Sequence, residues 1–163
     1  MFGRLLIRIA RMDGIGALVS FLLRHVSRCL PIKRLYEDAR LIAFRHPAPS
    51  ADPHILIVPK ARMRTARDVS DAMFADAART ACMLAAGHAP LEMRINGGAR
   101  QEVMQVHFHL LPMRASRGRR MRIGDVGRIE ELSARIQAID AARGYSIVFD
   151  LTGGGIFYEE EPV

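Results

Sequence analysis

The chain has 163 residues, half of which are hydrophobic, and a formal net charge of +7. This length and composition allow one domain with a real core, which excludes a disordered polymer and leaves little room for a second domain. The two cysteines, Cys29 and Cys82, lie far apart and outside any CxxC pattern, which argues against a disulfide framework and against a thiolate zinc site.

The positive charge is concentrated at the N-terminus. Residues 1–31 are therefore predicted to form a basic amphipathic arm that packs on the domain, on a protein partner or on an anionic membrane surface; nucleic acid is not the predicted partner. A solvated arginine-rich helix face would explain the same pattern, and the composition is also that of an organellar transit peptide. Before residue 37, Asp13 alone opposes seven basic side chains: Arg4, Arg8, Arg11, Arg24, Arg28, Lys33 and Arg34.

The sequence contains no apolar run of the roughly 18–20 residues that a membrane-spanning helix needs. We therefore predict a cytoplasmic protein. An organellar or peripheral membrane location through the arm is the alternative.

Two strands are predicted at the start of a domain that covers residues 32–115. Residues 39–44 are largely apolar, and residues 54–59 form a compact apolar strand that ends at its proline. The proline-rich segment 46–53 connects them, so an antiparallel pair is expected.

A helix and two more strands follow in the chain. Ser70 is a suitable N-cap for a helix that runs to about residue 86, where Gly87 ends it. Residues 91–95 alternate as a half-buried strand does, residues 96–100 form a tight loop, and residues 103–111 form a further strand. This order predicts an α+β fold in which one main helix packs on an antiparallel sheet. The apolar side chains expected to face the sheet are Phe74, Ala77, Ala81 and Leu84.

Residues 116–163 are predicted to form a C-terminal extension that packs on the domain or on a dimer. A helix is expected over residues 129–139, and a strand over residues 145–149 that ends at the glycines 153–155. A second basic cluster precedes this helix. We interpret it as a solvated loop, with steering of anionic substrates as the alternative. Its members are Arg114, Arg117, Arg119, Arg120 and Arg122.

The segment from Gln101 to Pro112 contains the residues that point to chemistry. Side chains alternate along a strand, so Gln105, His107 and His109 are expected on one face, opposite Val106 and Phe108. Neutral imidazole is a nucleophile near pH 7, and imidazolium stabilises a phosphate oxyanion. Two such rings side by side suit attack on phosphorus.

Three other interpretations of this histidine pair remain open. Both rings could simply face solvent. They could chelate zinc, with His54 or His46 as the third ligand. They could also form a buried structural pair, which requires a partner for each ring nitrogen.

The surrounding pattern resembles the histidine-triad (HIT) superfamily of nucleotide hydrolases and transferases. The resemblance covers about residues 32–113, in the order 36–44, 53–60, Asn96-Gly97-Gly98 and 101–112. It implies a HIT-like antiparallel sheet, a homodimer and a reaction that requires no metal or other cofactor.

The resemblance also implies roles for individual residues. His107 would attack the α-phosphorus of a nucleotide and form a nucleotidyl-histidine, which water would hydrolyse. His109 and His54 would contact the phosphate as the other catalytic histidines. The residues expected to line the substrate are Asn96, Gly98, Gln101, Gln105 and His46.

Three positions depart from the family pattern. Gln105 stands where the first histidine of the triad is usual, His46 replaces an acidic residue that binds ribose, and Glu102 replaces a small hydroxyl residue. The leading prediction is a nucleotide phosphoramidase, nucleotidyl hydrolase or transferase. The alternatives are a catalytically weak HIT domain that binds nucleotides or assembles a larger complex, and a metal-dependent hydrolase.

Overall fold

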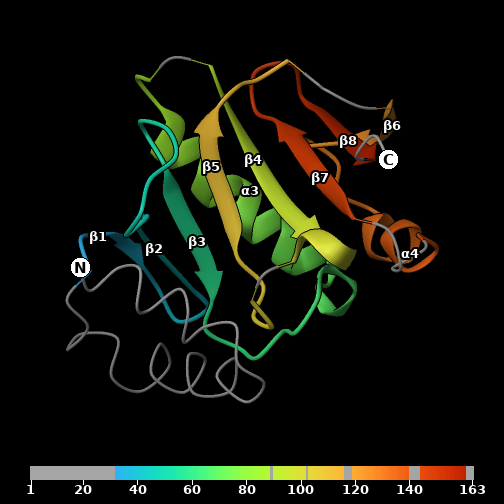
Figure 1. Cartoon of the computed structure of the whole chain (residues 1–163), viewed down its shortest axis with the longest axis horizontal. Helices are drawn as coiled ribbons and strands as arrows, with labels where there is room; N and C mark the ends of the chain where they lie inside the picture. The colour runs from blue at the N-terminus through green and yellow to red at the C-terminus, as the bar shows by residue number, and fades with distance from the viewer. Residues whose placement is uncertain (1–31, 89, 102, 116–118, 140–143, 161–163) are drawn as a thin grey trace.

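The computed structural model describes residues 32–160 except for 89, 102, 116–118 and 140–143 (Figure 1). The predicted basic arm, residues 1–31, lies outside the described residues. Within the described part, no helix has both the length and the hydropathy to cross a membrane.

The described strands form one antiparallel sheet, so the predicted α+β fold is confirmed (Figure 1). Across the sheet the strands follow the order β1-β2-β3-β5-β4-β7-β8-β6. The strands are β1 (Arg34–Glu37), β2 (Leu41–Arg45), β3 (Ile55–Pro59), β4 (Leu91–Gly97), β5 (Phe108–Pro112), β6 (Arg119–Asp125), β7 (Tyr145–Asp150) and β8 (Gly155–Glu160).

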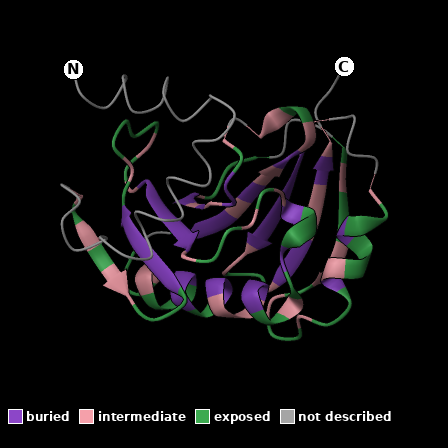
Figure 2. Cartoon of the chain, turned by 90° about the horizontal axis from the view of Figure 1, so that it is seen from below, coloured by how far each residue is buried: buried purple, intermediate pink, exposed green. Residues whose placement is uncertain are grey.

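The main helix, α3 (Asp71–Ala85), lies across one face of the sheet, as Figure 1 shows. Ser70 caps it as predicted, since its side chain accepts a hydrogen bond from the Met73 amide, and Gly87 follows with a positive φ of 81°. The buried ring of Phe74 lies 6.0 Å from Phe108 and 5.8 Å from Phe149, centroid to centroid. Figure 2 shows that the helix surface toward the sheet is buried.

The C-terminal extension continues the same sheet. β7 pairs with β4 along its length, and β8 pairs with β7 on its other side. The short helix α4 (Leu132–Gln137) packs beside this part of the sheet by burying Leu132 and Ile136. It lies within the helix expected over residues 129–139 but is shorter. Two single-turn helices complete the described elements: η2 (Ala66–Asp68) and η3 (Gly98–Arg100).

The interpretation of the second basic cluster as a loop is wrong for residues 119–125, which form the edge strand β6. This strand pairs with β8, which was not predicted because it begins within the glycine run 153–155. The arginines are compatible with a strand because they find local partners. Arg122 pairs with Asp125, and the Arg120 guanidinium lies 3.8 Å from the ring centre of Phe157.

The strand predicted over residues 103–111 begins later than expected, at Phe108. The preceding segment does not pair with β4 because it bonds elsewhere. The Val106 amide donates to the Met63 carbonyl, 2.8 Å away, and the side chain of Gln105 is buried. From Phe108 onward the expected alternation holds, since Phe108 and Leu110 belong to the core beneath α3.

Candidate active site

Four histidines from two regions of the chain meet on the face of the sheet opposite α3. His54 immediately precedes β3, and His109 lies on the neighbouring strand β5; their Nε2 and Nδ1 atoms are 2.9 Å apart. The His46 ring stacks on His54 at 4.0 Å between centroids, and the His107 ring meets His109 edge-on at 4.8 Å. The predicted convergence of His54, His107 and His109 is therefore present.

Hydrogen bonds define which nitrogen of each ring carries the proton. The Ser50 amide lies 3.2 Å from His54 Nδ1, which must accept, so the proton of His54 is on Nε2 and is donated to His109 Nδ1. His109 then carries its own proton on Nε2. His107 Nδ1 lies 2.9 Å from the carbonyl oxygen of Gln105, which can only accept.

In the neutral form of His107 the proton is therefore on Nδ1, and the lone pair is on Nε2. An imidazole with its lone pair on Nε2 thus adjoins a second imidazole that carries an Nε2–H donor. This combination provides a nucleophile and an anion-binding donor in one place.

Burial keeps two of these rings neutral. The pKa of His54, which is 7% exposed, is lowered to about 4 by burial first and then by the charge of His46 when protonated. The pKa of His109 is lowered to about 2 by burial and by neighbouring His107. Both rings are therefore uncharged at pH 7 and act through oriented N–H groups.

Ring nitrogens of His46, His54 and His109 lie within 4.8 Å of one another. Within the described part of the chain, these three rings are therefore the candidate ligands for a metal ion. Their orientation does not suit chelation. His46 and His54 are nearly parallel, with 14° between their planes, so their in-plane lone pairs do not converge. The Nδ1 atom of His46 also accepts a hydrogen bond from the Ala48 amide, and that of His54 accepts one from the Ser50 amide. The geometry favours a hydrogen-bonded chain over a metal site.

The prediction that Gln105 and His107 lie on one strand with His109 is wrong, because β5 begins only at Phe108. The side chain of Gln105 is only 2% exposed, and Nε2 donates to the carbonyls of Pro59 and Ala61, each 3.1 Å away. Gln105 thus connects the segment before β5 to the end of β3 and the residues that follow it. The same residue's carbonyl orients His107.

Three further predicted residues lie along β4 and the loop after it. Asn96 is on β4, and its Oδ1 accepts a 2.8 Å hydrogen bond from the Ser146 hydroxyl. Gly98 begins η3 with a φ of 58°, a conformation that favours glycine. Gln101 donates through Nε2 to the carbonyls of Arg64 and Val103, so its amide fastens the loop. Glu102 lies outside the described residues.

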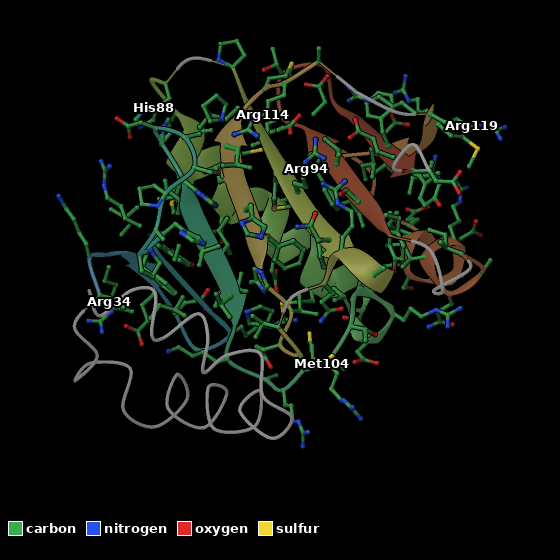
Figure 3. The ribbon with its side chains drawn as sticks, in the orientation of Figure 1. Arg34, His88, Arg94, Met104, Arg114 and Arg119 are labelled. Carbon is green, nitrogen blue, oxygen red and sulfur yellow. The ribbon has the colours of Figure 1, made fainter. Side chains whose placement is uncertain are left out.

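Sequence reasoning missed Arg94, which stands directly opposite His109 in the β4–β5 register. Two buried carboxylates hold it: Glu92 at 2.8 Å on the same strand and Glu159 at 3.1 Å on β8. The alternation in residues 91–95 indicated a polar face on β4. No local signal indicated a partner as distant in sequence as Glu159. Arg94 lies in the middle of the sheet in Figure 3.

Comparisons with known proteins agree with this arrangement. A family model described as HIT domain matches residues 28–116. The purine nucleoside phosphoramidase of Escherichia coli K12 is 34% identical over 108 residues, which cover 57% of this chain and 91% of that protein. A HIT family hydrolase from Clostridium thermocellum is 28% identical with a TM-score of 0.51, over 63% of this chain and 93% of its own.

The fold is also that of a histidine triad nucleotide-binding protein from Candida albicans. That structure is 21% identical with a TM-score of 0.51, and the match covers 74% of this chain and 94% of that chain.

Proposed function

We infer a reaction for this chain from the premise that it belongs to the HIT domain family, which the match over residues 28–116 shows. The chain is an enzyme of the HIT type. We propose that it is a nucleotide phosphoramidase, nucleotidyl hydrolase or transferase that acts at the α-phosphate. The similarity to a purine nucleoside phosphoramidase supports a nucleoside phosphoramidate as the first substrate to test.

In the proposed mechanism, the lone pair on His107 Nε2 attacks the α-phosphorus. The bond from phosphorus to the leaving group breaks, and the leaving amine keeps the bonding pair and takes a proton from water. Water then attacks the same phosphorus, the bond to His107 breaks, and a nucleoside monophosphate is released.

Neighbouring imidazoles are proposed to bind the phosphate during both steps. His109 donates from Nε2 to a non-bridging oxygen, and His54 holds His109 in that tautomer through the 2.9 Å hydrogen bond. Asn96 adds an amide donor from the adjacent strand β4. The observation that carries the proposal is the bond between His107 Nδ1 and the Gln105 carbonyl, because it leaves the lone pair on Nε2 beside His109.

The test is whether the protein releases AMP from adenosine 5′-phosphoramidate, which phosphorus NMR can monitor. We expect His107→Ala to lower turnover by at least about 1000-fold, since the nucleophile is removed, while AMP binding changes only a few-fold. His88→Ala is the matched control because His88 is exposed on the loop that leads into β4, and it should retain wild-type turnover (Figure 3).

Two outcomes separate the proposal from its alternative. A folded wild-type protein that leaves phosphoramidates, dinucleoside polyphosphates and nucleotide sugars intact would refute the enzymatic proposal. If that protein still bound AMP, it would support a nucleotide-binding or assembly module.

The homodimer implied by the family stays a prediction, and so does a cytoplasmic location. β4 is paired on both sides, with β5 and with β7, so a second copy cannot extend the sheet there. The outer strands of the described sheet are β1 and β6. Light scattering of the purified protein tests the dimer.

A further inference from the structure

We propose that Ser146, supplied by the C-terminal extension, is a positioning residue that orients the Asn96 amide toward the reacting phosphate. The proposal rests on the proposed function. Its basis is the contact between the start of β7 and the segment formed by the end of β4 and η3.

Three successive residues meet that segment: the one that precedes β7 and the first two of β7. A Cβ on Gly144 would lie 2.8 Å from Cγ of Arg100, so the chain passes close to η3 there. Tyr145 is paired with Gly97, and its ring occupies the space of a Gly97 side chain, since a Cβ there would lie 2.2 Å from Tyr145 Cζ. Ser146 is paired with Asn96.

The hydrogen bond from Ser146 determines which way the Asn96 amide faces. Ser146 is fully buried, and its hydroxyl donates to Asn96 Oδ1 over 2.8 Å. Because the oxygen is directed to β7, the amide nitrogen is directed away from β7. A carboxamide that is flipped would bring its oxygen, an acceptor, to the place where a donor is needed.

The opposite side of Asn96 is the side of the nucleophile. Ile95 is paired with Phe108, so the next residue of β4, Asn96, lies at the end of β5 that His107 precedes. Asn96 and His107 each adjoin a residue of the core beneath α3, so both side chains belong to the face opposite α3. An Nδ2–H donor at this position suits a non-bridging phosphate oxygen or the leaving group.

Rigid packing supports the orientation. Tyr145 is buried, and its fit against Gly97 fixes the register of β7 on β4, since a slip by one residue would turn Ser146 to the other face. The hydroxyl therefore has one position relative to Asn96. This is how the extension contributes to the site without contacting substrate.

A double-mutant cycle tests the proposal with adenosine 5′-phosphoramidate as the probe. Asn96→Ala should lower kcat by about 100-fold, as loss of one oxyanion donor does. Ser146→Ala should lower kcat by about tenfold with a smaller change in KM, and it should add less than twofold in the Asn96→Ala background. Ser146→Thr keeps the hydroxyl and should recover most of the activity. Ile156→Val, a buried substitution on β8 away from Asn96, controls for a general loss of stability.

Two results overturn the proposal. One is a full tenfold effect of Ser146→Ala in the absence of the Asn96 amide. The other is wild-type kcat in Ser146→Ala while Asn96→Ala is impaired.

A second measurement does not depend on turnover. In wild type, the two Nδ2 protons of Asn96 should give separate, sharp NMR signals that shift when AMP is added. In Ser146→Ala the carboxamide is free to turn about the Cβ–Cγ bond, so the two chemical shifts should move toward those of a free asparagine side chain and their response to AMP should decrease. Unchanged signals would refute the positioning role even if the wild type lacked turnover, in which case the proposed function would fail separately.

Discussion

The histidine cluster should make this protein sensitive to mild acid. The folded pKa values of His54 and His109 are lowered to about 4 and about 2, whereas an unfolded histidine titrates near 6.5. A lowered folded pKa means that the unfolded chain takes up protons first. Stability is therefore complete above pH 6.5 and decreases as the pH falls from there toward the folded pKa values.

The size of the effect follows from proton linkage. Between pH 7 and pH 5, each ring that stays neutral in the folded state while it is protonated in the unfolded state costs about 1.8 kcal/mol. His54 and His109 share a hydrogen bond, so their contributions are coupled. We expect about 3 kcal/mol for the pair, which is a large part of the roughly 5–15 kcal/mol of a typical domain.

The comparison is between wild type and a His54→Gln/His109→Gln variant, which lacks both titrating rings. Urea unfolding at pH 7 and pH 5 is followed by far-UV circular dichroism, because the chain has no tryptophan. Wild type should lose about 3 kcal/mol more of its free energy of unfolding than the variant between these two pH values. An equal loss in both proteins would show that the rings are not held neutral by the fold, and the reasoning would be wrong.

Two further substitutions test the packing around the site. Gly97→Ala forces the Tyr145 ring to move and should lower the free energy of unfolding by about 1–3 kcal/mol. The control is Gly127→Ala, which has open space at its Cβ and should change the free energy of unfolding little. Equal values for the two variants in urea unfolding would contradict this packing. Gln105→Ala removes the donor to two carbonyls and should lower the free energy of unfolding by about 1–3 kcal/mol. The control is Gln137→Ala, at an exposed position, which should lower it by almost nothing. Equal melting temperatures for the two variants would contradict the role of the buried amide.

Periodicity and local caps were sufficient to predict much of the core. The helix that Ser70 caps, the apolar strand that ends at Pro59 and the strand that begins at Tyr145 all form where expected. Their signals are local: a capping hydroxyl, a proline stop and alternating or periodic apolar residues. Periodicity could not predict that His54 and His109 converge. Only the family resemblance indicated that the strands near these two residues form one site.

Features that depend on distant partners were not predictable in the same way. Gln105 has the spacing of a strand residue, yet its amide donates to the carbonyls of Pro59, the last residue of β3, and of Ala61. β6 looks like a basic loop until its partner β8 is known. Ser146 is an ordinary polar residue in a strand, and only its register with Asn96 makes it important. Each of these outcomes was decided by a contact with a residue far away in the sequence.

The ion pairs of Arg94 lead us to expect that oriented donors contribute more than this guanidinium to substrate selection. Arg94 adjoins His109, but Glu92, which is 1% exposed, and Glu159 neutralise it, and the flanking Arg120 also faces Glu159. An isolated guanidinium here would bind any anion strongly. With the charge of Arg94 balanced, we expect the proposed His107 nucleophile and the fixed N–H groups to stabilise negative charge only where the phosphate oxygens are placed correctly. Such preorganised donors favour the transition state over non-specific anion binding.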